Sequence, residues 1–204
     1  LLAHSDRELF VPTVISLTRE ASLRRAIEGL GVPVHSLGIG LGVRGVSALV
    51  KLVAACRRVR PDVVHGWMYH GNLAATLVAR RGTPLIWGVR HSLYDLRKER
   101  RLTQYVIKLG VKLSHRPRRI VYNSRVSAEQ HESFGYSGES AQVIPNGFDC
   151  EALHPDPAAR ADVRAELGLE RDAVLVGLIA RYHPMKDHES FFRAAAILTQ
   201  RWPE

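Results

Sequence analysis

The fold of this chain is decided by two stretches, Pro61-Asp62-Val63-Val64-His65-Gly66 and Pro84-Leu85-Ile86-Trp87-Gly88-Val89. Each contains apolar residues at consecutive positions, which is typical of strands covered on both faces. Between them, residues 71–80 form an amphipathic segment with the length of a helix. A strand, a helix and a second strand in succession indicate a βαβ unit, so these residues predict a parallel sheet of the α/β class.

The same alternation continues on both sides of this unit. Further strands are predicted at residues 12–17, 32–37, 119–123, 142–144 and 173–179, beside the two at 62–66 and 84–89. Further helices are predicted at residues 20–30, 46–59, within 95–115, and at 124–134, 158–167 and 187–200. Gly31, Gly82 and Gly168 come just after predicted helices, where a left-handed C-terminal cap is expected.

Two domains are predicted within the 204 residues. Residues 1–148 form a Rossmann-like domain that we expect to be incomplete at its start, because the chain begins with Leu1 instead of Met. Residues 149–171, with Pro155 and Pro157 in a polar setting, are predicted to connect the domains. Residues 172–204 then supply the first β-α unit of a second Rossmann-like domain, which we expect to be truncated.

Composition excludes several classes of protein. Hydrophobic residues make up 46% and charged residues 24% of the chain, as in soluble globular proteins. Cys56 and Cys150 are far apart, so a disulfide framework and a cysteine metal site are not expected, and a reducing cytoplasm fits. The net charge of +9 favours an anionic partner. No helix-turn-helix, zinc-finger or RNA-binding signature accompanies the basic residues, so we expect no nucleic acid.

A glycine-rich loop, Gly40-Leu41-Gly42-Val43-Arg44-Gly45, matches the GxGxxG pattern of dinucleotide-binding proteins. That pattern also needs an acidic residue at the end of the following strand to bind the ribose. The strand ends instead in His65-Gly66-Trp67. We therefore interpret the loop as a flexible connection, which disfavours a nicotinamide-dependent oxidoreductase.

A second motif, Val176-Gly177-Leu178-Ile179-Ala180-Arg181, continues to Lys186 and the start of a helix near Asp187. The carboxyl end of a strand is where open α/β sheets bind ligands. An arginine fork, a lysine charge and the free N–H groups of a helix N-terminus together suit a diphosphate. The alternative is that Arg181 and Lys186 are solvated surface cations.

Four motifs in order resemble one known family. The run from Gly177 to Lys186 resembles the Gly-x-x-x-Arg-x4-Lys region of the retaining family-4 glycosyltransferases, which have the GT-B fold. Pro61-Asp62-Val63-Val64-His65 resembles that family's strand ending in His near the acceptor cleft. Val121-Tyr122-Asn123-Ser124 and Ile144-Pro145-Asn146-Gly147-Phe148-Asp149 resemble its strand ending in Ser and its junction between domains. The match covers nearly the whole chain.

The resemblance implies roles for particular residues. Arg181 and Lys186 would hold the diphosphate of the donor and stabilise the leaving nucleoside diphosphate, and His91 would face the transferred sugar. These three would be the catalytic residues, although His91 could instead be a capping or surface histidine. The residues expected to contact the acceptor or sugar are His65, His70 and Asn146. No metal and no cofactor are expected, since the nucleotide sugar is a co-substrate and the histidines lack metal-site spacing.

The implied function is transfer of a hexosyl group from a nucleotide sugar to a glycan or lipid-linked acceptor, in cell-surface polysaccharide or lipopolysaccharide biosynthesis. A nucleotide-sugar epimerase of the same two-domain architecture is one alternative, and a basic nucleic-acid-binding protein is another. We expect the family's first strand with its Gly-rich loop to precede Leu1, and its Glu-x7-Glu element to follow Glu204. The chain alone is therefore expected to be inactive.

The segment 97–119 is rich in Lys and Arg and has apolar residues at helical spacing. Such a basic amphipathic helix is able to lie on an anionic membrane, which would suit a lipid-linked acceptor. The expected location is the cytoplasm, with peripheral attachment to the inner face of the membrane. The alternative is a charged helix face that is only solvated.

Overall fold

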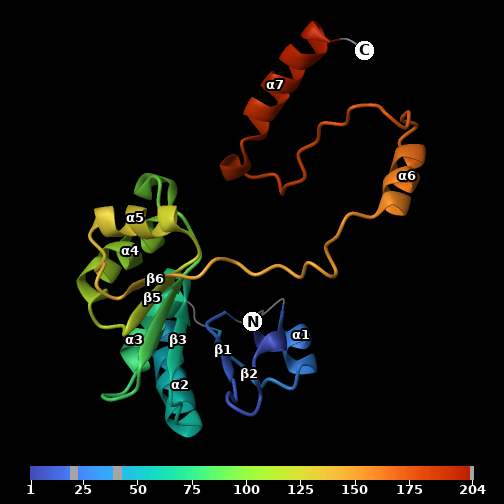
Figure 1. Ribbon diagram of the computed structural model, residues 1–204. Helices are drawn as coiled ribbons and strands as arrows, with labels where there is room; N and C mark the ends of the chain where they lie inside the picture. Colours follow the sequence, from blue (N-terminus) through green and yellow to red (C-terminus); the bar gives the residue numbers. More distant parts are fainter. Residues whose placement is uncertain (19–22, 39–42, 203–204) are drawn as a thin grey trace. The chain divides into compact units, whose positions relative to one another are not determined.

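A computed structural model of the chain describes residues 1–18, 23–38 and 43–202. These residues form two compact units, Leu1–Gly147 and Phe148–Glu204, whose elements are labelled in Figure 1. The division falls after Gly147, so the segment predicted to connect the domains lies in the second unit.

The strands of the first unit are all paired in parallel. β1 (Val14–Ser16) pairs with β2 (Val34–Ser36) in a two-stranded sheet. The other four strands form one sheet in the order β3-β4-β5-β6. Its members are β3 (Val64–Trp67), β4 (Leu85–Val89), β5 (Arg119–Tyr122) and β6 (Ala141–Val143). The α/β class and the parallel pairing are confirmed, although within the described residues the strands divide into two sheets.

Helices connect the strands, as expected for parallel crossovers. The first unit contains η1 (Leu2–His4), α1 (Arg24–Gly29), α2 (Val43–Val59), α3 (Met68–Val78), η2 (Leu96–Lys98), α4 (Arg101–Leu113) and α5 (Arg125–Phe134). In Figure 1, α3 packs on β3 and β4, α4 packs against α3, and α5 packs against β5 and β6. The left-handed glycines predicted after helices are confirmed for α1 and for α6 (Pro157–Glu166), because Gly31 and Gly168 directly follow the cap residues and have positive φ. Gly82 also has positive φ, but α3 ends at Val78 with Ala79 as its cap, so Gly82 lies in the turn that follows.

A buried polar network fixes α3 on β4. The side-chain amide of Asn72 donates to the Gly88 carbonyl at 3.3 Å, and the Gly88 N–H donates back to Asn72 Oδ1 at 3.3 Å. The indole of Trp87 donates to the Thr76 hydroxyl at 2.9 Å. Because unpaired polar groups are costly in a core, these bonds specify how the helix sits on the strand. The start of α3 is thereby held at the carboxyl ends of the strands.

Gly66 allows α3 to approach β3 very closely. A Cβ atom at this position would lie 2.6 Å from the Cα of Asn72 and 2.8 Å from the carbonyl oxygen of Gly71. Both are backbone atoms of α3, which cannot move away without moving the helix. Only glycine therefore fits at this point of β3.

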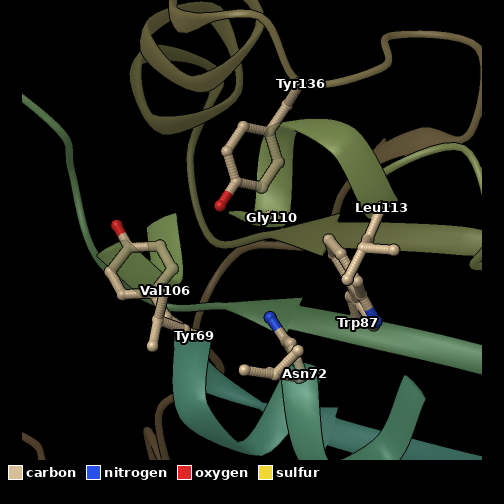
Figure 2. A pocket seen from close by; sticks show the side chains of 8 residues that line it. Tyr69, Asn72, Trp87, Val106, Gly110, Leu113 and Tyr136 are labelled. Atoms are coloured by element: carbon tan, nitrogen blue, oxygen red, sulfur yellow. The ribbon is translucent and has the colours of Figure 1, made fainter. Parts of the chain in front are cut away.

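A second close contact joins α4 to Tyr136, the second residue after α5. The hydroxyl of Tyr136 donates to the Ile107 carbonyl at 3.2 Å. Figure 2 shows this hydroxyl directed toward the turn of α4 that contains Gly110, where a Cβ atom would lie 2.2 Å from it. The adjacent pocket, partly lined by Tyr69 and Trp87, has a volume of about 10 Å³. That is room for about one water molecule, so this pocket belongs to the core and not to a substrate site.

The described residues of the second unit form two α-helices and a short turn of 3₁₀ helix. They are α6 (Pro157–Glu166), η3 (Pro184–Lys186) and α7 (His188–Arg201). The Asp156 side chain caps α6 by accepting from the N–H groups of Ala158 and Ala159. Arg164 donates to the carbonyls of Glu170 and Ala173 at 2.8 Å each, which holds α6 against the segment that follows it.

The predicted strand at residues 173–179 is not present. No strand is assigned there, and its apolar residues Val174 and Ile179 are 91% and 103% exposed. A strand requires a neighbouring strand to share its hydrogen bonds, and the described residues of this unit do not provide one. The helical half of the predicted β-α unit is confirmed as α7.

Candidate functional site

Polar side chains gather at the carboxyl ends of the strands in the first unit. Arg90 directly follows β4, and its guanidinium lies 5.6 Å from the centre of the Trp67 ring at the end of β3. Its Nη2 donates to Oδ1 of Asn146, which follows β6. Stacking and hydrogen bonding together preorganise an arginine. Arg90 therefore joins three strand ends into one polar surface.

His65 lies in β3 and borders this surface. Its ring packs at 5.1 Å from that of Trp67, and its Nε2 lies 3.1 Å from the point where a Cβ of Gly88 would be. Although the residue as a whole is exposed, this one-sided packing lowers the pKa of His65, and the positive charge of Arg90 lowers it further. A neutral imidazole results, able to donate and to accept hydrogen bonds.

His91 is the second residue after β4, and it is held from two directions. Its Nε2 lies 2.9 Å from Oε1 of Glu99, and both side chains are about three-quarters buried, at 23% and 26% exposure. The Ser127 hydroxyl donates to the His91 carbonyl at 2.7 Å. His91 is thus fixed at the strand end and remains accessible to a ligand.

Behind His91 lies a buried chain of hydrogen bonds. Nδ1 of His131 lies 2.7 Å from the Ser127 carbonyl, which can only accept, so Nδ1 carries the proton. Nε2 then accepts from the Tyr69 hydroxyl at 2.9 Å. Burial lowers the pKa of His131 and raises the pKa of Tyr69, so both stay neutral. The Tyr69 ring meets the His91 ring edge to face at 6.4 Å, which connects this chain to the surface.

The start of α3 is strained. Met68, its first residue, has a φ of +61°, a left-handed conformation that costs a residue with a Cβ about 1–2 kcal/mol. Its sulfur accepts from the Arg90 N–H at 3.3 Å.

His70, two residues after Met68, is exposed and makes no hydrogen bond or ring contact with the described residues. The structure leaves the His70 side chain available on the first turn of α3.

Arg181 and Lys186 lie in the second unit, on the loop before α7. Both are exposed, and neither forms an ion pair with a described residue. His188 contacts the Arg181 carbonyl at 3.0 Å, and Lys186 ends η3. The start of α7 is partly occupied, because Asp187 accepts from the Ser190 N–H at 3.4 Å. The helix N-terminus is therefore less free than the sequence indicated, and an anion would depend mainly on the two cations.

The glycine-rich motif falls partly outside the described residues, and a hollow of the first unit lies away from the polar surface. Residues 40–42 of the GxGxxG motif lie outside the described residues, and α2 already begins at Val43. A hollow of about 630 Å³ between α2 and α3 is lined in part by Arg60, Pro61 and Arg80. Since Arg60 and Pro61 lead into β3, this hollow lies at the amino ends of the strands, opposite the polar surface.

Across residues 1–18, 23–38 and 43–202, no cluster of three or more His, Cys, Asp or Glu side chains could hold a metal ion. None of the helices described is both long enough and apolar enough to cross a bilayer.

Several residues of this surface were not identified from the sequence. The sequence could have identified Arg90 as a site residue, because it directly follows the carboxyl end of a predicted strand and precedes His91. No sequence pattern identifies Glu99 or His131, because their roles depend on how η2 and α5 pack beside β4.

Comparison with known proteins assigns the chain to a family. The family model described as Glycosyltransferase Family 4 matches residues 6–152. The chain is 34% identical over 71 residues to "Putative glycosyltransferase EpsF" of Bacillus subtilis, covering 33% of the chain and 18% of that relative. It is 27% identical over 150 residues to a "D-inositol 3-phosphate glycosyltransferase" of Nocardiopsis dassonvillei, covering 70% of the chain and 34% of that protein.

Solved structures show the same fold. The crystal structure of Anabaena Alr3699/HepE in complex with UDP superposes with a TM-score of 0.75 at 20% identity, covering 90% of this chain and 49% of that one. Its complex with UDP-glucose gives a TM-score of 0.73, also at 20% identity and with the same coverage. The chain thus spans about half the length of these structures, and less of the curated relatives. Because the family model matches most of the residues, including the strands whose ends form the polar surface, the chain belongs to Glycosyltransferase Family 4.

Proposed function

We propose that the protein of which this chain is a part transfers a hexosyl group from a nucleotide sugar to a glycan or lipid-linked acceptor. The observation that carries the proposal is the match of residues 6–152 to the glycosyltransferase family. The relatives named above are glycosyltransferases by description, which favours transfer over the epimerase alternative.

The proposed donor is a nucleotide sugar, and its diphosphate is assigned to Arg181 and Lys186. UDP and UDP-glucose in the complexes of the structural neighbour support a donor of this class. Both cations are exposed and have no acidic partner among the described residues, so neither must break an ion pair to bind phosphate. Their positive charge would stabilise the leaving diphosphate electrostatically, without a metal ion.

The proposed acceptor side is the polar surface of the first unit. His65 and Asn146 border Arg90, whereas His70 and His91 offer ring nitrogens from α3 and the end of β4. Neutral imidazoles and amides recognise hydroxyl groups, which are the main polar groups of a glycan. We assign retention of the anomeric configuration and a place in cell-surface polysaccharide or lipopolysaccharide biosynthesis to the same proposal.

The test uses the full-length protein with a panel of nucleotide sugars, with and without glycan and lipid-linked acceptors. We expect sugar transfer that requires an acceptor, without added metal and with the chelator EDTA present, and no transfer by residues 1–204 alone. If the nucleotide sugar is instead epimerised without an acceptor, the protein is an epimerase and not a glycosyltransferase. Retention on DNA at physiological salt would instead favour a nucleic-acid-binding protein.

We also propose that α4 attaches the protein to the inner face of the cytoplasmic membrane. Leu102, Tyr105 and Leu109 follow one another at helical spacing and are 52%, 70% and 41% exposed. Lys108 and Lys112 are exposed on the same helix. Apolar side chains flanked by cations are typical of helices that lie on anionic lipid.

Reversing the charge of Lys108 and Lys112 is expected to reduce membrane binding of the full-length protein. Each cation near an anionic surface contributes about 1 kcal/mol, so Lys108→Glu with Lys112→Glu should weaken binding by at least about 2 kcal/mol. Co-sedimentation with vesicles of anionic and of neutral lipid measures the effect. The matched control reverses Arg57 and Arg58 on α2, which should leave binding unchanged. Equal recovery of the unmodified protein with both vesicle types would contradict attachment.

A further inference from the structure

Glu99 and His91 form a close pair that the family motifs do not include. The distance between Nε2 of His91 and Oε1 of Glu99 is 2.9 Å, and both side chains are largely buried. A carboxylate has only acceptor atoms, so the nitrogen facing it must carry a proton. In the neutral ring that proton is the only one, which leaves Nδ1 as an acceptor.

The backbone around Glu99 is held independently of His91. The Glu99 N–H donates to the Leu96 carbonyl at 3.1 Å, closing the turn of η2. The Gln104 side chain donates to the Glu99 carbonyl at 2.8 Å, which ties this residue to the first turn of α4. Glu99 is therefore a fixed acceptor and not a mobile surface carboxylate.

The other sides of His91 are also defined. Ser127 donates to its carbonyl at 2.7 Å, and the Tyr69 ring meets its ring edge to face. Tyr69 is itself held by its hydrogen bond to the buried His131. Among the described residues, Nδ1 of His91 has no hydrogen-bond partner. The ring is thus anchored through Nε2, while its free acceptor is available to a ligand.

We propose that Glu99 is a positioning residue that fixes the tautomer of His91. In this tautomer Nδ1 of the neutral ring accepts a hydrogen bond from a hydroxyl group of the substrate, and the ring does not donate a hydrogen bond to the substrate. The ligand recognised in this way is a hydroxyl group of the bound sugar or of the acceptor glycan. This inference rests on the proposed function for its substrate class, but the tautomer itself does not depend on catalysis.

Variants of the full-length protein separate the two nitrogens. The amide of asparagine lies near the position of Nδ1 and that of glutamine near Nε2, so His91→Asn should retain more activity than His91→Gln. Removing the orienting carboxylate by Glu99→Ala is expected to lower kcat about 10- to 100-fold, by analogy with the loss of a carboxylate that orients a metal-bound histidine. In the His91→Asn background the same change should cost less than about threefold, because its partner nitrogen is already absent.

An equal loss from Glu99→Ala in both backgrounds would overturn the proposal, since Glu99 would then act without His91. The matched control is Glu132→Ala, an exposed carboxylate in α5, which should leave kcat unchanged. Folding of each variant is compared by thermal unfolding, so that a general loss of structure is recognised.

The tautomer is measured directly by 15N NMR of full-length protein labelled in its histidines, with the His91 signals assigned by their loss in His91→Asn. We expect a proton on Nε2 and none on Nδ1 in the neutral ring, and this preference should be lost in Glu99→Ala. A proton on Nδ1 would refute the inference even if sugar transfer is observed. Absence of sugar transfer with the expected tautomer would instead refute the proposed function and leave the positioning role intact.

Discussion

Full-length protein with Arg181→Ala is expected to turn over about 100- to 1,000-fold more slowly than the unmodified protein. A preorganised group that stabilises charge in the transition state contributes about 3 to 4 kcal/mol, and each 1.36 kcal/mol is a tenfold change in rate. Arg181 is exposed, so removing its side chain should not disturb folding. The loss should appear in kcat as well as in kcat/KM, because the charge on the diphosphate grows as the bond to the sugar breaks.

Two further variants make this result specific. Arg171→Ala removes an exposed arginine from the opposite end of the 173–179 segment, and should leave kcat within about twofold. Lys186→Met should resemble Arg181→Ala if both cations hold the diphosphate. Unchanged turnover in Arg181→Ala would remove this residue from the site and leave the donor without its assigned phosphate contact.

Gly66→Ala is expected to lower the free energy of unfolding by about 3 kcal/mol or more. The added methyl would lie 2.6 Å from the Cα of Asn72, so α3 would have to move as a whole. That movement would also break the paired hydrogen bonds between Asn72 and Gly88. Overpacking alone typically costs 1–3 kcal/mol, and leaving buried polar groups unpaired adds to it. Urea unfolding of the full-length protein measures the change.

Gly71→Ala is the matched control for this measurement. Gly71 lies in α3, and the nearest atom to its added Cβ would be 3.9 Å away, which is an ordinary contact. Alanine is the better helix former by about 1 kcal/mol, so this variant should be as stable as the unmodified protein or more so. If Gly66→Ala proved as stable as Gly71→Ala, the close approach of α3 to β3 would be wrong.

The strands of the first unit were predictable because their apolar residues are consecutive. Leu85, Trp87 and Val89 mark β4, and all three are buried. The start of α3 was predicted three residues too late, at Gly71, because glycine disfavours helix interiors. In the structure this glycine lies in the first turn, where packing on β3 decides the helix start. Local propensity therefore located the elements, while tertiary contacts set their ends.

The site was only partly predictable, for a different reason. His91 was identified from its place at a strand end, but Glu99 is brought to it by the turn of η2. Arg90 and Asn146 are separated by 56 positions and meet through the order of the strands. The strand predicted at residues 173–179 was wrong. A run of apolar residues indicates a segment able to form a strand, but the strand forms only where a neighbouring strand shares its backbone hydrogen bonds.

His131 makes the stability of the first unit decrease at acidic pH. Burial lowers its pKa, so the unfolded chain takes up a proton at this residue more readily than the folded protein does. Its contribution to folding is complete above about pH 6.5, the ordinary pKa of histidine, and decreases as the pH falls toward the lowered value. A second proton on this ring would displace the Tyr69 hydroxyl from Nε2. Acidification is therefore expected to weaken the packing behind His91.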